Sequence, residues 1–427
     1  MSKVIIIGAG AMGLAAAYQA ATEGHSVEVL EAAPEPGGMA AHFDLSGLSI
    51  ERFYHFVCKS DAPTFQLMEE LGIGDKIRWK RTTMGYFTGG RLHPWGDPLS
   101  LLKFPEVSLI SRLRYALFAF VSIRRRNWPA LENEPARTWI EGWCGSDVYD
   151  RLWRPLFHYK FYRYADDISA AWIWTRIKRL GKSRKSIFSE QLGHIEGGSQ
   201  TLVNALRQGI EALGGEIKCS CPAERVMTEA GRVVGVRTPH GTLRADAVIC
   251  TAPIPLVPDL VPDLPEDLLA RYRSIENIGV CCLVFLLNRS VTPHFWVNVS
   301  EPGIEIPGFV EFSNLRDLEN TVIYIPYYMP TDHPKFSWSD DELLGEALSY
   351  LQRVNPEIQR EDVCASHVGR LRYAQPVCTT GFAARIPPVR TPIDGLQIAD
   401  TCFYYPEDRG LSESIRLGRA MGQNISP

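Results

Sequence analysis

The sequence predicts an α/β fold built around a parallel sheet, and three features near its start support this prediction. Lys3–Gly10 reads "KVIIIGAG", an apolar, β-branched run that stops at glycines, which is typical of a buried parallel strand. An Ala-rich stretch then runs to Gly24, which indicates a helix with its stop signal. "SVEVLE" follows as a second strand and closes at Glu31. Strand, helix and strand in this order predict a βαβ unit.

Glycines of this unit have the spacing of a dinucleotide-binding turn. Gly8 permits the tight turn, Gly10 lets the backbone approach a pyrophosphate, and Gly13 lets the helix pack closely on the strand. The pyrophosphate would lie at the helix N-terminus. Glu31 is placed to accept a hydrogen bond from a ribose 2′-hydroxyl, and Ala32 after it offers no positive charge to the 2′-phosphate of NADP. This unit alone does not show whether the dinucleotide is NAD or FAD.

Composition and charge exclude several other classes. The chain has 427 residues, 45% of them hydrophobic and 22% charged, which indicates a globular protein of two or three domains. A net charge of −4 gives no general attraction to nucleic acid. Ten scattered cysteines show neither zinc-ligand nor disulfide-framework spacing, so we expect no metal site and a cytoplasmic location. No run is long and apolar enough to span a bilayer, so the chain is expected at most to be peripheral to the inner membrane face.

The stretch "EAAPEPGGMA", Glu31–Ala40, adds a Gly-Gly pair shortly after the acid. It resembles the second signature of the flavoprotein amine oxidase superfamily, which includes monoamine oxidases, protoporphyrinogen oxidases and phytoene desaturases, with UDP-galactopyranose mutase as a structural relative. Gly37 and Gly38 match that signature, whereas Met39 stands where an Arg is usual. If that Arg helps to neutralise the pyrophosphate, another residue or backbone N–H groups must do so here. A plain surface turn is the alternative interpretation.

Later segments resemble the same family in the same order. Gly193–Ile217 resembles the return to the cofactor domain, and the family's residue at the Val226 position meets the adenine through its backbone. "DAVICTAPIP" resembles the strand that leaves this domain, with Thr251 and Ala252 at the crossing. "GLQIAD" ends at Asp400, where the family has an acid that binds the ribityl chain.

The last segment, "SESIRLGRAMGQNI", predicts a helix with Ser412 as its N-cap. In the family the start of this helix points at the N1–C2=O edge of the flavin, where reduction leaves negative charge that a helix N-terminus stabilises. Arg409 lies just before it and could meet the pyrophosphate, or form a loop salt bridge with Asp408 or Glu407. The resemblance implies FAD as the cofactor, with contacts at Gly8, Gly10, Ala11, Met12, Gly13, Glu31, Ala32, Gly37, Gly38, Met39, Val226, Thr251, Ala252, Asp400, Arg409, Ser412, Ser414 and Ile415.

The resemblance also implies a domain arrangement. It predicts a Rossmann-like FAD-binding domain of the glutathione-reductase type with an inserted α+β substrate domain. The FAD-binding domain would comprise 1–75, 191–255 and 376–427. The substrate domain would comprise 76–190, mainly helical, and 256–375, a sheet plus a helix.

An apolar stretch in the first substrate segment, "LSLLKFPEVSLISRLRYALFAFVSIRRRNWPAL", has two interpretations. It could be an amphipathic helix that faces a membrane, as for a lipid-soluble substrate. It could instead be a core helix that ends in a solvated basic cluster at Arg124, Arg125 and Arg126. We expect the core helix.

Candidates for the catalytic residues lie outside the cofactor segments. His55 in "FYHF" could orient substrate or move a proton, or be a buried structural side chain. Tyr324, Tyr327 and Tyr328 could line the site, although a tyrosine-rich strand is usually core. Glu311 is the one acid in an apolar strand and could bind a polar substrate group, or simply face outward.

These residues and the resemblance predict an FAD-dependent oxidoreductase in which a substrate C–H bond gives a hydride to flavin N5. The partners would be an unidentified small-molecule substrate and an electron acceptor, oxygen or another carrier. The sequence does not place the Lys that many amine oxidases hold near flavin N5, which favours C–C dehydrogenation over oxidation of a simple amine. Two alternatives stay open, a non-catalytic flavoprotein and a flavin-dependent nucleotide-sugar mutase with Arg370, Arg372 and Arg385 as candidate pyrophosphate ligands.

Overall fold

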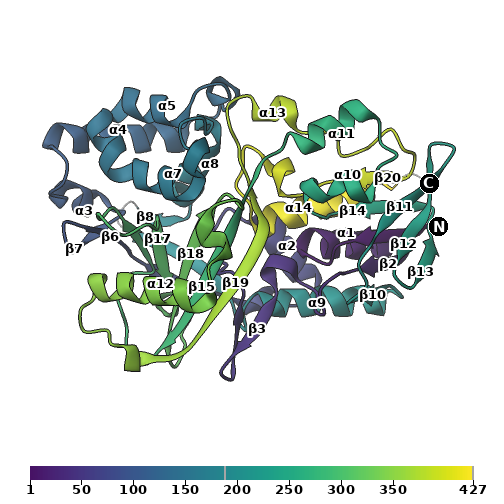
Figure 1. Cartoon of the computed structure of the whole chain (residues 1–427), viewed down its shortest axis with the longest axis horizontal. Helices are drawn as coiled ribbons and strands as arrows, with labels where there is room; N and C mark the ends of the chain where they lie inside the picture. The colour runs from purple at the N-terminus through teal and green to yellow at the C-terminus, as the bar shows by residue number, and fades with distance from the viewer. Residues whose placement is uncertain (187–188, 426–427) are drawn as a thin grey trace.

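A computed structural model describes residues 1–186 and 189–425 and confirms the predicted α/β fold. Figure 1 shows two lobes side by side. The right-hand lobe contains the parallel sheet and both termini, and the left-hand lobe contains a mixed sheet with helices above and below it. Where the proposed domain boundaries fall stays a prediction.

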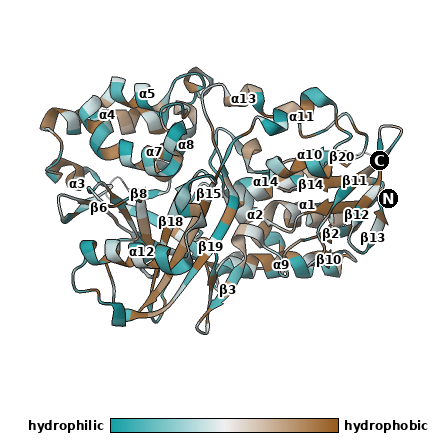
Figure 2. Ribbon diagram, viewed as in Figure 1, coloured by the Kyte–Doolittle hydropathy of each residue, from teal (hydrophilic) through white to brown (hydrophobic). Residues whose placement is uncertain are grey.

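The right-hand lobe is organised by a five-stranded parallel sheet in the order β10-β2-β1-β14-β20. Its central strand β1 pairs with β2 on one side and β14 on the other, and all three are almost wholly buried. Figure 2 shows hydrophobic residues along the strands of this lobe. Apolar, β-branched strands are expected where helices cover both faces of a sheet. The strand bounds are β1 Lys3–Ile7, β2 Ser26–Leu30, β10 Glu216–Lys218, β14 Ala247–Cys250 and β20 Leu396–Ile398.

Helices α1 and α14 pack side by side in this lobe (Figure 1). Two glycines of α14 allow the contact, because a Cβ added at Gly418 would meet the Met12 carbonyl oxygen at 2.2 Å and one at Gly422 would meet the Ala16 carbonyl oxygen at 2.5 Å. Since 418 pairs with 12 and 422 with 16, the two helices run parallel. The helices of this lobe are α1 Ala11–Thr22, α2 Ala62–Glu70, α9 Ser199–Ala212, α10 Val257–Leu260, α11 Glu266–Arg273, α13 Phe382–Arg385 and α14 Leu411–Gln423.

The left-hand lobe contains a seven-stranded sheet in the order β19-β15-β18-β17-β16-β6-β7. Alternate side chains of its strands face opposite ways. One face packs against α12, Asp340–Val354, and the other belongs to the main core of the molecule. The strands are β6 Met84–Thr88, β7 Arg91–Trp95, β15 Asn277–Leu287, β16 Trp296–Val299, β17 Gly308–Glu311, β18 Thr321–Met329 and β19 Val363–Pro376.

Smaller sheets and helices complete the molecule. The strands are β3 His42–Leu45, β4 Leu48–Glu51, β5 Ile77–Thr82, β8 Arg184–Ser186, β9 Ser189–Ile195, β11 Arg225–Glu229, β12 Arg232–Thr238 and β13 Gly241–Arg244. Figure 1 shows helices above the left-hand sheet, α4 Leu109–Arg124, α5 Ala136–Cys144, α7 Arg154–Phe161 and α8 Ala170–Lys182, and α3 Pro98–Lys103 beside β7. The short helix α6, Ser146–Val148, follows α5 in the chain.

Two expectations about helices were wrong. The N-cap of α14 is Gly410, and Ser412 lies one residue inside the helix. Helix α4 is not a core helix on all sides, because Leu109, Ile110, Leu113, Leu117 and Phe120 are 53% to 72% exposed. Only its opposite face, with Phe118 and two serines, enters the core. None of the helices that the structure describes is long and apolar enough to cross a bilayer.

Candidate cofactor and substrate site

The two glycine loops of the first βαβ unit pack against each other. Gly8 has a φ of +98°, and a Cβ added at Gly13 would meet the Gly8 carbonyl oxygen at 1.9 Å. Gly37 has a φ of +122°, and its N–H donates to the Ala9 carbonyl oxygen at 2.8 Å. Positive φ and close backbone contact both favour glycine. The loop 37–40 therefore lies directly on the turn after β1.

The N-terminus of α1 offers unused backbone donors at this turn. Its N-cap, Gly10, makes no side-chain cap, and the first hydrogen bond of the helix is from Leu14 N–H to the Gly10 carbonyl. The N–H groups of Ala11, Met12 and Gly13 therefore have no partner within the helix. Such donors, together with the helix dipole, suit a pyrophosphate even though Met39 replaces the family's Arg.

Glu31 lies beside this turn at the end of β2. Its carboxylate accepts hydrogen bonds from Ala9 N–H at 2.7 Å and from Ala33 N–H at 2.9 Å. Each carboxylate oxygen keeps a further lone pair for a ribose hydroxyl. The Glu31 carbonyl accepts from Cys221 N–H at 2.8 Å, which holds the segment before β11 at this end of the sheet. Val226 follows in β11, paired with Val236.

Thr251 and Asp400 support the turn from the neighbouring strands. The Thr251 hydroxyl donates to the Ile7 carbonyl at 2.9 Å and would lie 2.8 Å from a Cβ at Gly8. Asp400 accepts from Ile254 N–H at 2.9 Å and from Cys402 N–H at 2.8 Å. Burial raises the pKa of Asp400. Its role toward the ribityl chain stays a prediction.

A second helix N-terminus without a side-chain cap belongs to α14, which runs parallel to α1. Gly410 gives α14 no side-chain cap, Ser412 is buried in its first turn, and Ile415 is fully buried. Ser414 is used within the protein, since its hydroxyl donates to the Gly410 carbonyl and accepts from Tyr404. From the pairing of residue 418 with 12, α14 begins six residues ahead of α1, or about 9 Å. Two uncapped helix N-termini, a glycine cradle and an acid at one end fit a flavin dinucleotide.

Arg409 faces the substrate lobe. Its guanidinium donates to the Tyr328 hydroxyl at 2.7 Å and also to the Ala374 carbonyl. Asp408 pairs instead with Arg176 of α8 and accepts from Gln375 Nε2 at 3.1 Å. The local salt bridge predicted for Arg409 is therefore wrong, its pyrophosphate contact stays a prediction, and the residue joins the two lobes.

Lys160 of α7 points at the same place and was missed in the sequence. It is 3% exposed, and its Nζ lies 4.8 Å from the Tyr328 ring centre and 5.0 Å from that of Trp172. Among the described residues its Nζ has no hydrogen-bond partner, although it contacts these rings. Burial lowers the pKa of Lys160 well below its usual value, and the positive charges of Arg176 and Arg409 lower it further, against the opposing effect of the Asp408 carboxylate. The only signal in the sequence is a Lys among aromatic residues, "FHYKFY".

His55 has its Nδ1 buried and without a hydrogen-bond partner within the described part of the chain, and Glu51, Arg409 and His42 are the charged or titratable side chains that influence it. Burial lowers the pKa of His55 to about 4, so the imidazole is neutral at pH 7. A neutral imidazole can donate or accept one hydrogen bond at each nitrogen. Its participation in catalysis stays a prediction.

Three other candidates have different surroundings. Tyr324 is fully buried on the core side of β18, and its hydroxyl donates to the Glu51 carbonyl at 2.7 Å. Tyr327 faces the opposite side of the same strand, toward α12. Glu311 also lies on that side, paired with Ile323, and its carboxylate accepts from Ser290 and from Thr292 N–H. The outward-facing alternative for Glu311 is wrong, because the side chain is 1% exposed. Its substrate role stays a prediction, and its position on the α12 side of the sheet does not favour that role.

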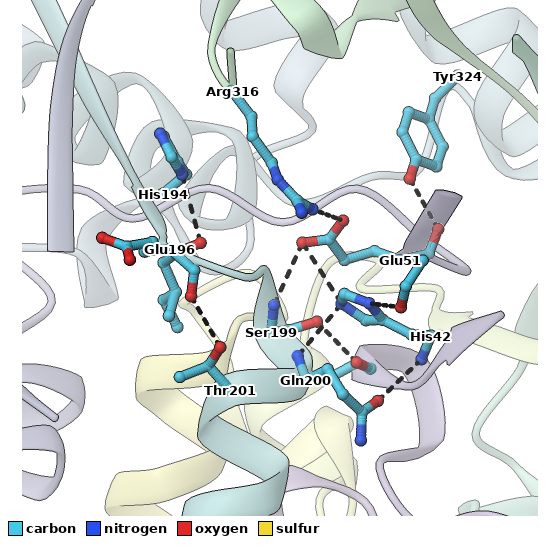
Figure 3. Close-up of polar contacts among 12 residues, drawn as sticks. His42, Glu51, His194, Glu196, Ser199, Gln200, Thr201, Arg316 and Tyr324 are labelled. Carbon is cyan, nitrogen blue, oxygen red and sulfur yellow. Dashed lines mark hydrogen bonds and ion pairs between the residues drawn. The ribbon is translucent and has the colours of Figure 1, made fainter. Parts of the chain in front are cut away.

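Glu51 anchors a network between the lobes (Figure 3). Its carboxylate accepts from Ser199 N–H at the start of α9, lies 3.7 Å from His42 Nε2 and lies 3.4 Å from Arg316 Nη1. Burial would raise the pKa of Glu51, but the His42 hydrogen bond and the charges of His42 and Arg316 leave it below its usual value. The network joins the loop after Gly37 to the substrate sheet.

Known proteins resemble this chain in sequence and in fold. The family model described as flavin containing amine oxidoreductase matches residues 13–401. The chain is 24% identical over 318 residues to zeta-carotene-forming phytoene desaturase of Myxococcus xanthus, covering 66% of this chain and 60% of that protein. It is 24% identical over 306 residues to 15-cis-phytoene desaturase of Arabidopsis thaliana, covering 65% of this chain and 52% of that protein. The match thus spans little more than half the length of these relatives.

Two solved structures have the same fold over almost the whole chain. A putative protoporphyrinogen oxidase from Exiguobacterium has a TM-score of 0.77 at 20% identity, covering 99% of this chain and 98% of that one. Putrescine oxidase bound to putrescine has a TM-score of 0.73 at 17% identity, with the same coverage of 99% and 98%. None of these proteins is a mutase, so the comparisons give that alternative no support.

Proposed function

Because this chain belongs to the flavin-containing amine oxidoreductase family, we propose that it is an oxidoreductase that uses FAD to take a hydride from a substrate C–H bond. Bound FAD supplies the two-electron acceptor, and the protein supplies position and electrostatics. A small-molecule substrate and an electron acceptor, oxygen or another carrier, complete the reaction.

The observation that carries this proposal is the pair of parallel, uncapped helix N-termini at Gly10 and Gly410. The first offers N–H groups to a pyrophosphate, and the second begins about 9 Å further on, where a flavin ring would follow along the ribityl chain. In this proposal the pyrophosphate of FAD binds at the N-terminus of α1 and its flavin ring lies at the N-terminus of α14. A nicotinamide dinucleotide would need only the first of these two helix N-termini.

Side chains on the substrate side would position the reacting C–H bond. Tyr328 and Arg409 are held together across the two lobes, and Lys160 and Trp172 close the other side. These residues come from α7, α8, β18 and the segment before α14, so the substrate would be enclosed where the lobes meet. His55 is a candidate for moving a proton, because its imidazole is neutral at pH 7 and its Nδ1 has no partner among the described residues.

The exposed face of α3 and α4 suits a location on a membrane surface. We define this α3–α4 face by Leu99, Leu102, Leu109, Ile110, Leu113, Leu117 and Phe120, all of them about half exposed or more. Exposed basic side chains accompany it at Lys103, Arg114, Arg124 and Arg126. An apolar stripe flanked by cations matches an anionic lipid surface, with the apolar side chains inserted between the headgroups.

Vesicle sedimentation tests this location. The protein should sediment with vesicles of phosphatidylcholine and phosphatidylglycerol, more weakly with phosphatidylcholine alone, and not after Leu113→Glu with Leu117→Glu. Leu213→Glu alters an equally exposed leucine at the end of α9 and should have no effect. Binding that survives the double substitution would contradict the proposed location.

The visible spectrum of the purified protein tests the flavin chemistry. We expect bands of bound oxidised flavin, bleaching on anaerobic photoreduction, and their return when air is admitted. Return within seconds would indicate an oxidase, and slow return a dehydrogenase with another acceptor. Absence of any flavin band after incubation with excess FAD would overturn the proposed function.

A further inference from the structure

We propose that the substrate carries a carboxylate, and that this group binds in a cationic chamber between α7, α8, β18 and β19. The chamber is defined by Lys160, Trp172, Arg176, Tyr328, Gln375, Asp408 and Arg409. This inference rests on the proposed function, since it names the class of substrate that the same site would take.

Charge within the chamber is unbalanced. Its one carboxylate, Asp408, is already used by Arg176 and by Gln375 Nε2. Among the described residues, Arg409 donates only to neutral oxygens, the Tyr328 hydroxyl and the Ala374 carbonyl. The Lys160 Nζ lies among aromatic rings and makes no hydrogen bond with a described residue, although the Asp408 carboxylate also interacts with it electrostatically. One carboxylate is thus shared by three basic side chains in a largely buried cluster, and an anionic ligand would reduce this imbalance.

Unused donors point to the same ligand. Trp172 is 1% exposed, and its Nε1 is buried without a hydrogen-bond partner in the described part of the chain. The indole ring lies 5.0 Å from Lys160 Nζ and also 5.0 Å from Arg176 Cζ. Indole and guanidinium groups only donate, the Lys160 side chain can donate as well, and an ionised carboxylate is a group that only accepts.

The chamber is accessible and lies beside the expected flavin edge. Arg176 and Asp408 keep 26% and 16% of their side chains exposed, so the chamber opens on their side. Asp408 and Arg409 come directly before Gly410, the N-cap of α14. A carboxylate held here would thus place the rest of the substrate next to the helix start that we assign to the flavin.

An amine substrate fits this chamber poorly. A protonated amine would approach Arg176 and Arg409, while the only carboxylate is already paired. Gln375 Oε1 is the one buried acceptor without a partner among the described side chains of the chamber. One amide oxygen does not balance two guanidinium groups.

Ligand titrations on the full-length, flavin-loaded protein test the inference. Benzoate, benzamide and benzylamine are matched probes with negative, neutral and positive head groups, and their binding is followed by flavin absorbance and by calorimetry. We expect benzoate to bind at least tenfold more tightly than benzamide, and benzylamine to bind most weakly. Arg409→Gln and Lys160→Gln should each weaken benzoate binding at least tenfold and leave benzamide binding unchanged.

Control variants separate this effect from general damage. Lys178→Gln removes a cation from α8 that stacks on Trp174 outside the chamber, and it should not change benzoate affinity. Arg409→Lys keeps the charge and should retain part of the affinity even if Arg409→Gln is poorly folded. Circular dichroism checks the fold of each variant.

Three outcomes would overturn the inference. They are equal affinity for benzoate and benzamide, tighter binding of benzylamine, and tighter binding of inorganic phosphate than of benzoate. The proposed function is tested separately by the flavin bands. If flavin binds and photoreduces while benzoate shows no preference, only the inference fails, and if flavin does not bind, calorimetry with benzoate still tests the chamber.

Discussion

Arg409 donates a hydrogen bond of 2.7 Å to the hydroxyl of Tyr328. The first residue lies one position before the N-cap of α14, and the second lies in the central part of the substrate sheet. This contact crosses from one lobe to the other at the point where cofactor and substrate would meet. It depends on strand register, because Tyr327 on the next position faces α12 instead.

Tyr328→Phe should destabilise the protein by about 1.5 to 3 kcal/mol, since it removes the partner of a charged donor. Tyr327→Phe is the matched control on the opposite face, where the hydroxyl has no hydrogen-bond partner among the described residues, and it should be neutral or slightly stabilising. Urea unfolding of both variants measures the difference. Equal free energies of unfolding would contradict this account.

Gly418→Ala should force α14 away from α1, because the new Cβ would lie 2.2 Å from the Met12 carbonyl oxygen. Overpacking of this kind costs about 1 to 3 kcal/mol, and flavin content should fall because both helix N-termini move. Gly345→Ala in exposed α12 meets no atom within 4 Å and should be neutral or stabilising by up to about 1 kcal/mol. Flavin absorbance per protein and thermal unfolding report both effects; an unaltered flavin content in Gly418→Ala would be evidence against the helix pair as the cofactor cradle.

Glu31→Gln should weaken FAD binding about tenfold, because one oxygen of the acceptor pair becomes an NH₂ donor that repels Ala9 N–H and offers the ribose less charge. Glu35→Gln changes an exposed acid four residues later and should leave affinity unchanged. Reconstitution of the flavin-free protein with FAD, followed by fluorescence quenching, gives the two dissociation constants. Identical dissociation constants for the two variants would show that Glu31 does not contact FAD.

Glu311 should make stability fall as pH rises. Burial raises its pKa from 4.5 to about 7 in the folded protein, so the folded state binds its proton more tightly than the unfolded state. This contribution is complete below pH 4.5 and is lost as pH rises to about 7, a change of about 3 kcal/mol. Glu311→Gln resembles the protonated form and should flatten this part of the profile. Urea unfolding of both proteins at pH 5 and pH 7.5 isolates the difference, and parallel profiles would show that Glu311 does not titrate there.

Arg316→Met should lower the free energy of unfolding by about 2 to 3 kcal/mol, because the buried Glu51 carboxylate then has one cation fewer beside it. Adding Glu51→Gln to it should restore part of the loss, because the unbalanced charge is then removed. Arg353→Met breaks a more exposed pair with Glu301 and should cost less than about 1 kcal/mol. Chemical denaturation of the unmodified protein and the three variants gives the free energies of unfolding, and a double variant less stable than Arg316→Met would refute the charge argument.

The cofactor half of the molecule could be predicted because its signals are local. Gly8, Gly10, Gly13 and Glu31 lie within one βαβ unit, where spacing alone decides which backbone atoms meet. The N-cap of α14 was misassigned from a local preference, since Ser412 is a good capping residue and Gly410 fills that position.

The substrate half depends on contacts that no short segment contains. Lys160, Arg176 and Asp408 interact in the folded protein, although strands of several sheets lie between Arg176 and Asp408 in the sequence. Read alone, each is an ordinary charged residue of a helix or loop. The face of α4 was also misjudged, because leucines at helical spacing predict an apolar stripe without saying whether protein or another apolar phase covers it.

The pairing of α1 with α14 has a consequence for synthesis of the chain. The first helix of the cradle leaves the ribosome early, but its partner lies at residues 411–423 and follows about 20 to 80 s later. Until then the apolar side of α1 lacks the glycine-lined surface that covers it, and the edge strand β20, which lies just before α14 in the chain, also joins the sheet late. We therefore expect flavin to bind only after α14 has been synthesised, so that partial chains that end before residue 411 should contain no flavin.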